Sequence, residues 1–137
     1  MSAFLTRLDM QLKVDRDGKP VLNGSGRQIY ILLSVFSYAS DVARKFIKVI
    51  DVPKGFETDL ASVPRWPIVF LMDGETSQEP AVIHDYLYAT GLLPRKLCDE
   101  VLLEAMTLTG VPWWRKYSIY WGVRLGGASH YGTIQHS

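Results

Sequence analysis

Apolar and polar residues alternate in several short stretches of the first third of the chain. Alternation of this kind, enriched in β-branched and aromatic side chains, is typical of strands that bury one face. Residues 15–18 (DRDG) and 23–26 (NGSG) have the composition of turns, because Gly tolerates positive φ and Asp or Asn side chains bond the nearby backbone. The expected strands cover residues 5–14, 27–38, 45–52 and, more briefly, 56–58. They predict an N-terminal antiparallel β-sheet of three to four strands.

The second half of the chain contains helical stretches that Gly and Pro separate. Pro is tolerated in the first turn of a helix, and Gly commonly follows the last turn. Two such junctions begin at Gly91 and Gly110. The expected helices span residues 78–90, 94–109 and 113–125. Strands followed by three helices predict an α+β fold rather than alternating βαβ units. We expect one domain over residues 1–127 and a C-terminal tail over residues 128–137.

The bulk composition agrees with one globular domain. The chain has 137 residues, of which 47% are hydrophobic and 21% are charged. A formal net charge of +1 disfavours nucleic-acid binding, because it creates no strong positive field. Cys98 alone cannot form an internal disulfide. We expect no signal peptide and no membrane span, because the N-terminus lacks an apolar core and residues 29–36 are too short to cross a bilayer.

The first expected helix is apolar around most of its circumference, which is typical of a buried helix. After its first turn, only His84 and Asp85 can carry charge near neutral pH. Burying a lone polar group without a partner costs roughly 2–7 kcal/mol, and burying a charge costs more. These two side chains therefore need partners, or they line a cleft.

Two further segments could supply those partners. In the second expected helix, Asp99 falls at the edge of the apolar face, where we expect it to reach a neighbouring helix while staying partly solvated. Cys98 lies on the apolar face, and we expect a core residue there. The predicted loop over residues 58–64 carries Asp59 and Ser62, and loops on a rigid scaffold often carry function.

Three kinds of chemistry fit these residues. A divalent metal ion (Zn, Mn or Fe) could be bound by His84, Asp59 and Asp99, with Asp85 orienting the imidazole or acting as a base. Ser62 could instead be a nucleophile that His84 and an Asp activate. The third reading is structural, with the carboxylates holding His84 in place. The residues alone leave all three open.

The third expected helix combines large aromatic side chains with cations. Such a combination can form a protein interface or a stacking surface for single-stranded nucleic acid. The simpler interpretation, which we favour because the net charge is near zero, is that the aromatics complete a small core and the cations face water. The candidate partner surface consists of Trp113, Trp114, Arg115, Tyr117 and Trp121.

Several motifs, in order along the chain, resemble one known family. Residues 55–65 (GFETDLASVPR) resemble its G-F-x-T-D-x-A-S-[IV]-P-R signature, and residues 81–88 (AVIHDYLY) resemble its A-[AV]-x-H-D-x-L-Y. Residues 98–106 (CDEVLLEAM) resemble A-D-x-x-[FL]-x-x-A-M, with Cys98 where Ala is usual. Residues 110–125 resemble the closing G-V-x-x-x-R…V-R segment. The chain thereby resembles the family known as domain of unknown function 1353.

This resemblance implies a small phage-encoded protein, located in the host cytoplasm, in the virion, or in both. It implies no particular reaction. It does indicate the same positions that the helix geometry selects, namely Asp59, Ser62, His84, Asp85 and Asp99.

Two functions follow as hypotheses. The leading one is a phage-encoded, metal-dependent hydrolase that acts on cell-wall peptide or another host polymer, with the polymer suggested by the phage context alone. The alternative is a non-enzymatic virion component, of the tail or baseplate, which binds other phage structural proteins. In that case the His and Asp residues are structural. Association of the chain with itself is left open.

Overall fold

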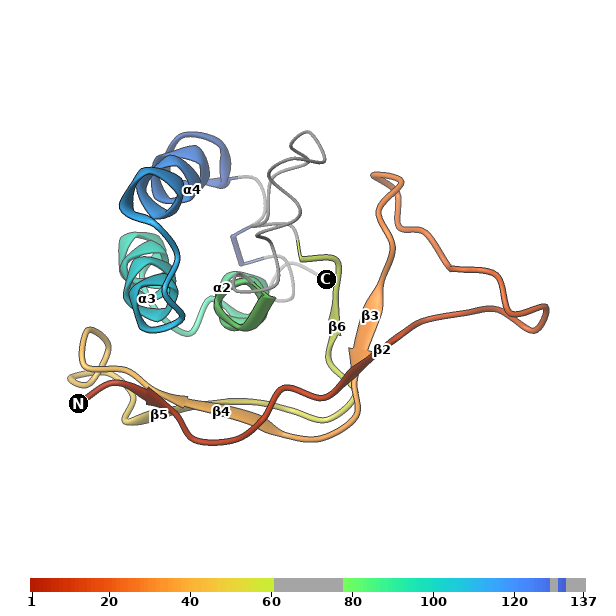
Figure 1. The fold of residues 1–137 in the computed structure, drawn as a ribbon, viewed down its shortest axis with the longest axis horizontal. Helices are drawn as coiled ribbons and strands as arrows, with labels where there is room; N and C mark the ends of the chain where they lie inside the picture. Colours follow the sequence, from red (N-terminus) through yellow and green to blue (C-terminus); the bar gives the residue numbers. More distant parts are fainter. Residues whose placement is uncertain (61–77, 129–130, 133–137) are drawn as a thin grey trace.

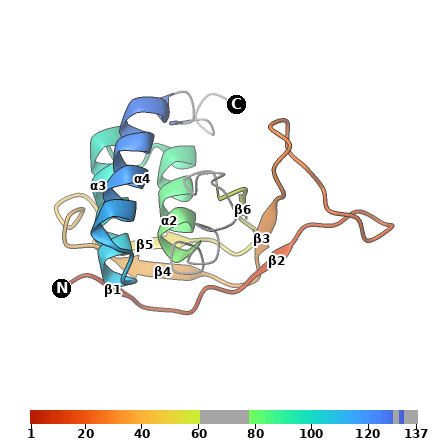
Figure 2. The ribbon, with the colours of Figure 1, turned by 45° about the horizontal axis from the view of Figure 1, so that its top comes forward.

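The computed structural model describes residues 1–60, 78–128 and 131–132. In this part of the chain, six short strands precede three helices, which confirms the predicted α+β class and the antiparallel pairing. The helices lie together over one sheet, and a second sheet lies to their side (Figure 1). Turning the molecule keeps this arrangement in view, with β4 and β5 crossing beneath the helices (Figure 2).

The strands form two three-stranded sheets. The first sheet has the order β1-β4-β5 and the second has the order β2-β3-β6. Within each sheet, neighbouring strands pair antiparallel. β5 begins later than the predicted residue 45, because residues 41–46 form a turn. The strand bounds are β1 Ala3–Phe4, β2 Met10–Leu12, β3 Tyr30–Leu32, β4 Phe36–Ala39, β5 Val49–Val52 and β6 Glu57–Thr58.

A bend divides both of the long strands that the alternation predicts. Residues 3–12 run antiparallel to residues 30–39 through both sheets. At the bend, the Leu33 N–H still donates to the Asp9 carbonyl. Leu33 and Val35 are about half exposed there, so the alternating pattern continues where the apolar side chains leave the core. Periodicity therefore predicts one long strand where the chain passes from one sheet to the other.

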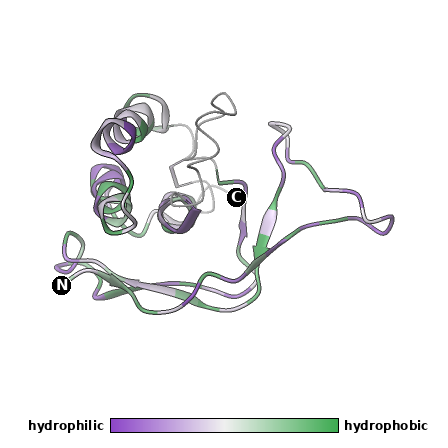
Figure 3. Ribbon diagram, in the orientation of Figure 1, coloured by the Kyte–Doolittle hydropathy of each residue, from purple (hydrophilic) through white to green (hydrophobic). Residues whose placement is uncertain are grey.

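Residues 13–29 form an arm that projects from the body (Figure 1). Isolated bridges join Val14 to Pro20 and Leu22 to Gln28. The outer tip is hydrophilic (Figure 3), and there the Asp15 carboxylate accepts the backbone N–H groups of residues 17 and 19. The two predicted turns are therefore confirmed, and both belong to this arm.

The three predicted helices are confirmed to within one or two residues. They are α2 Gln78–Thr90, α3 Arg95–Leu108 and α4 Trp113–Gly126. Pro94 and Pro112 cap α3 and α4. Gly91 and Gly110 take φ values of 63° and 80°, a conformation that Gly adopts without steric cost. None of these helices is long and apolar enough to cross a membrane.

The main core lies between the β1-β4-β5 sheet and helices α2 and α3. α2 is buried around most of its circumference, as predicted, and Cys98 lies in the same core. α4 packs against α3 through a smaller cluster of Leu102, Met106, Val111 and Ile119. Full burial of one large apolar side chain stabilises a fold by roughly 1.5–3 kcal/mol. α4 buries few such groups, so apolar packing alone holds it weakly.

Gly127, just after α4, is expected to tolerate no side chain. A Cβ there would lie 2.5 Å from the Val123 carbonyl oxygen and 2.9 Å from atoms of the Tyr88 side chain. We expect Gly127→Ala to destabilise the fold by about 1–3 kcal/mol through this overpacking. Gly122→Ala is the control, because its Cβ would meet nothing within 4 Å and should stabilise the helix by about 0.5–1 kcal/mol. Equal free energies of unfolding in denaturant would contradict this account.

Candidate functional site

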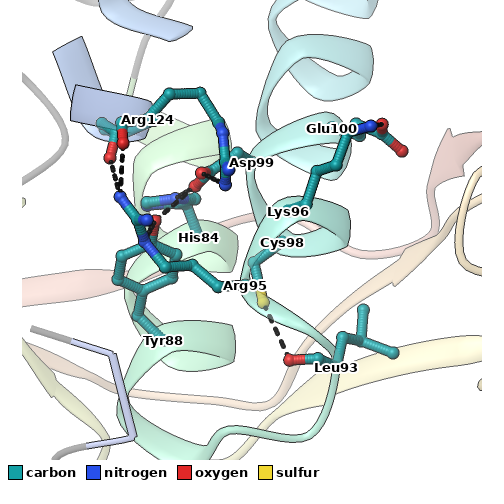
Figure 4. A network of polar contacts seen from close by, with 10 residues as sticks. His84, Tyr88, Leu93, Arg95, Lys96, Cys98, Asp99, Glu100 and Arg124 are labelled. Atoms are coloured by element: carbon teal, nitrogen blue, oxygen red, sulfur yellow. Dashed lines mark hydrogen bonds and ion pairs between the residues drawn. The ribbon is translucent and has the colours of Figure 1, made fainter. Parts of the chain in front are cut away.

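Three helices bring charged and polar side chains to one buried point. His84 and Tyr88 lie one turn apart on α2, Arg95 and Asp99 lie one turn apart on α3, and Arg124 comes from the last turn of α4. Figure 4 shows these five side chains, which we call the Asp99 network. Asp99 is completely buried and His84 is 2% exposed.

The Asp99 carboxylate accepts hydrogen bonds at both oxygens. Oδ1 lies 2.7 Å from His84 Nε2 and accepts the Tyr88 hydroxyl at 2.6 Å. Oδ2 accepts Arg124 Nη1 at 2.8 Å. A carboxylate can only accept, so Nε2 carries the imidazole proton in this arrangement. Three donors from two neighbouring helices thus converge on one anion of α3.

Arg95 completes the Asp99 network from its outer side. Its Nε donates to the Tyr88 hydroxyl at 3.1 Å. Its Nη2 donates to the carbonyl oxygens of Val123 and Arg124, each at 2.7 Å. These carbonyls belong to the last turn of α4, the negative end of the helix dipole, where a cation is stabilising. Arg95 and Arg124 therefore fasten the C-terminal end of α4 to α2 and α3.

Burial and hydrogen bonding shift the pKa values of the network in defined directions. Burial is the main cause that lowers the pKa of His84 below its ordinary 6.5, and it outweighs the opposing effect of Asp99. Burial alone would raise the pKa of Asp99, but the bonds from His84, Tyr88 and Arg124 lower it below 3.8. Near neutral pH, His84 is therefore neutral and Asp99 is charged, with Arg124 as its counter-ion.

The structure brings together only some of the residues predicted from the sequence. His84 and Asp99 are in contact. The expectation that Asp99 is partly solvated is wrong, because three donors compensate its full burial. Ser62 lies outside the described residues. Asp59 and Asp85 lie elsewhere, on a separate surface hollow.

That hollow has a volume of about 320 Å³ and lies between α2 and the β6 region. Asp59 and Asp85 line it together with Glu57. The Asn23 side-chain amide donates to Asp59 Oδ2 at 2.7 Å, and Arg27 Nε donates to the Asp59 carbonyl at 3.2 Å. Asp59 thus joins the second turn of the arm to the end of β6.

The described residues do not form a group that matches the predicted metal site. Within residues 1–60, 78–128 and 131–132, no group of three His, Cys, Asp or Glu side chains could hold a metal ion. Both oxygens of Asp99 are already used by N–H and O–H donors. Metal binding by His84, Asp59 and Asp99 stays a prediction.

The aromatic side chains of α4 face away from the core, so the interpretation that they complete it is wrong. Their exposed fractions are high, and Leu125 adds to the same side of the helix. Arg115, expected in water, is buried at 3% exposure. The thin apolar contact with α3 leaves most of this helix uncovered. The exposed side chains are Trp113 (72%), Trp114 (42%), Tyr117 (46%), Trp121 (57%) and Leu125 (86%).

Sequence reasoning missed Tyr88, Arg95 and Arg124 as members of the network. Two of them carry a local signal, because Tyr88 and Arg95 lie four residues from His84 and Asp99 on their helices. Residues at that spacing share a face, so a polar pair on each helix indicates a common contact. Arg124 carries no such signal, because its contact depends on how α4 crosses α3.

Comparison with known families agrees with the order of motifs along the chain. A family described as "Protein of unknown function (DUF1353)" matches residues 31–123. The chain belongs to this family. No curated protein and no solved structure matches it. The matched range contains the whole Asp99 network except Arg124, which follows it by one residue.

Replacing Asp99 is expected to destabilise the fold strongly. Asp99→Asn leaves Arg124 without its counter-ion and places an NH2 donor against existing donors, either His84 and Tyr88 or Arg124. Breaking a buried ion pair in this way costs about 3–5 kcal/mol. Glu100→Gln, the adjacent position, is the control, because Glu100 forms a 4.0 Å surface pair with Lys96 that is worth about 0.3–0.5 kcal/mol. Urea unfolding of both variants checks this, and a similar small change in each would refute it.

The stability of the fold is expected to depend on the titration of His84. The folded state holds the pKa of His84 below 6.5, so its contribution to stability is present above pH 6.5 and is lost as the pH falls below that value. His84→Gln keeps an N–H donor near Asp99 and removes the titration. Calorimetry between about pH 7 and about pH 5 should show the native Tm falling more than that of the variant. Parallel Tm curves would contradict the prediction.

Proposed function

We propose that this chain is a non-enzymatic protein that binds a partner protein through α4, as a structural component of a phage particle. The observation that carries the proposal is the exposed aromatic side of α4, which we call the α4 face: Trp113, Trp114, Tyr117, Trp121 and Leu125.

The five side chains of the α4 face form one continuous surface because of their spacing along the helix. Trp113, Tyr117, Trp121 and Leu125 follow one another at intervals of four residues, and Trp114 lies beside them, so all five point to one side of the helix. Aromatic side chains cover about 150–250 Å² each when fully buried, so the exposed fractions amount to roughly 600 Å². Patches on monomers seldom exceed about 300–600 Å², and a standard interface covers about 800 Å² per partner. The α4 face is therefore large enough to form the centre of an interface.

The Asp99 network supports this role by giving the face a rigid base. Arg95 and Arg124 fix the C-terminal end of α4 through bonds to its carbonyls and to Asp99. A helix held in one position presents its side chains without an ordering cost when a partner binds. The network therefore acts as scaffold in this proposal, as the structural alternative for the His and Asp residues requires.

Burial of the network argues against its use in catalysis. A catalytic group must contact a substrate, whereas His84 is 2% exposed and Asp99 is completely buried. The donors around Asp99 also occupy the positions that a substrate or an ion would need. We therefore prefer the docking role to hydrolysis.

Charge favours a heterologous protein partner. α4 contains three cations and no acidic residue, so the same face of a second copy would supply no carboxylate to pair with them. Nucleic acid would need a broad basic field, and the net charge is +1. The assignment to phage assembly rests on the resemblance of the motifs to those of phage-encoded proteins.

The test is the copy number of the chain in particles purified from the phage-producing host. We expect a stoichiometric number, because a structural component occupies fixed positions. Trp121→Ala should lower incorporation roughly tenfold or more, as loss of a central aromatic does at protein interfaces. Phe46→Ala is the control, since Phe46 is 64% exposed but lies away from α4. Absence of the chain from particles, or equal losses for both variants, would refute the proposal.

A further inference from the structure

Arg115, in the first turn of α4, is buried, and no acidic side chain among residues 1–60, 78–128 and 131–132 forms an ion pair with it. It is 3% exposed, and its Nη1 has no hydrogen-bond partner in the described part of the chain. Burying a charged group without a partner costs several kcal/mol, so buried arginines are normally paired. A native chain that keeps such a group has a use for it that the isolated chain does not show.

The other two arginines at the helix contacts show what compensation looks like in this molecule. Arg124 pairs with Asp99 at 2.8 Å, and Arg95 bonds two carbonyl oxygens and a hydroxyl. The guanidinium groups of both arginines lie at the C-terminal end of α4, where the helix dipole favours cations. Arg115 sits at the opposite, positive end, which disfavours a cation. Its placement is therefore unfavourable on two counts in the free chain.

The start of α4 also lacks the groups that usually neutralise a helix N-terminus. Pro112 is the N-cap and provides no side-chain hydrogen bond, and the first turn contains no acidic residue. Helix starts normally use Ser, Thr, Asp or Asn caps and acidic side chains in the first turn. Side chains of a helix lean toward its N-terminus, so the guanidinium of Arg115 is directed at the same end. A cation and an uncapped positive helix end together define a place for an anion.

Resting on the proposed function, we propose that the first turn of α4 receives a carboxylate of the partner protein, an Asp or Glu side chain that pairs with Arg115. Trp113 and Trp114 flank the position and would exclude water from the pair. The guanidinium meets the carboxylate by a change of rotamer, which is common at interfaces. One buried arginine beside an aromatic surface suits one carboxylate, whereas a nucleic-acid backbone needs many cations.

The partner is therefore an apolar surface carrying one acidic residue opposite the first turn of α4. Its apolar part covers the α4 face and its carboxylate supplies the charge that α4 lacks. The carboxylate also decides the register of docking, because a single charged pair fixes one position relative to the apolar α4 face.

The experiment uses two blocked tetrapeptides, Leu-Asp-Leu-Phe and Leu-Asn-Leu-Phe, each with an acetylated N-terminus and an amidated C-terminus. Each is titrated into the full chain and followed by tryptophan fluorescence and by the NMR signal of the Arg115 side chain. We expect the acidic peptide to bind at least tenfold more tightly than its amide, with a shift of the Arg115 signal only for the acid.

Arg115→Met is the decisive variant, because it fills the same buried space without charge. In this variant the two peptides should bind equally, and the Tm should stay level or rise, since an uncompensated charge has been removed. Trp121→Ala should weaken both peptides equally in the native chain. A marked fall in Tm for Arg115→Met would show that Arg115 is already compensated and would overturn the inference.

The outcomes separate this inference from the proposed function. Equal binding of acid and amide by the native chain, with a loss of both in Trp121→Ala, overturns the carboxylate site and leaves the docking face intact. No binding of either peptide, together with absence from particles, overturns both. Tighter Arg115-dependent binding of inorganic phosphate or of a single-stranded oligonucleotide, or self-association that Arg115→Met abolishes, overturns the carboxylate in favour of that occupant.

Discussion

The described part of this structure depends on one buried anion, Asp99, and on the donors that three helices bring to it. Both oxygens accept bonds, from His84 and Tyr88 on one side and from Arg124 on the other. The arrangement costs desolvation and is stable only when every donor is present. It gives α4 a single position, which its small apolar contact with α3 would specify poorly.

The helix boundaries could largely be predicted, because Gly and Pro act through the backbone of the residues beside them. Gly91, Pro94, Gly110 and Pro112 placed the helices to within one or two residues. The bend that divides the strands could not be predicted, because it depends on which sheet each segment joins. Leu33 and Val35 continue the alternation there while facing solvent, so periodicity carries no signal of the change.

The candidate site could be predicted in part for the same reason. His84 and Asp99 are polar residues on apolar helices, and the cost of burial alone indicates that they need partners. Arg124 joins them only through the packing of α4, which no local pattern encodes. The α4 face was misjudged because aromatic residues on a helix are usually core residues, whereas here Arg115 points inward and the tryptophans point outward.

The outer tip of the arm has a practical consequence. The Asp15 side chain accepts the backbone N–H groups of the turn. The bridge from Val14 to Pro20 closes the turn without contact with the core. A segment whose bonds are all local opens at little free-energy cost, so its amides should exchange with solvent early while the helices stay protected. The same independence makes residues 16–18 a suitable point for inserting an epitope or a fluorophore, far from the surface offered by α4.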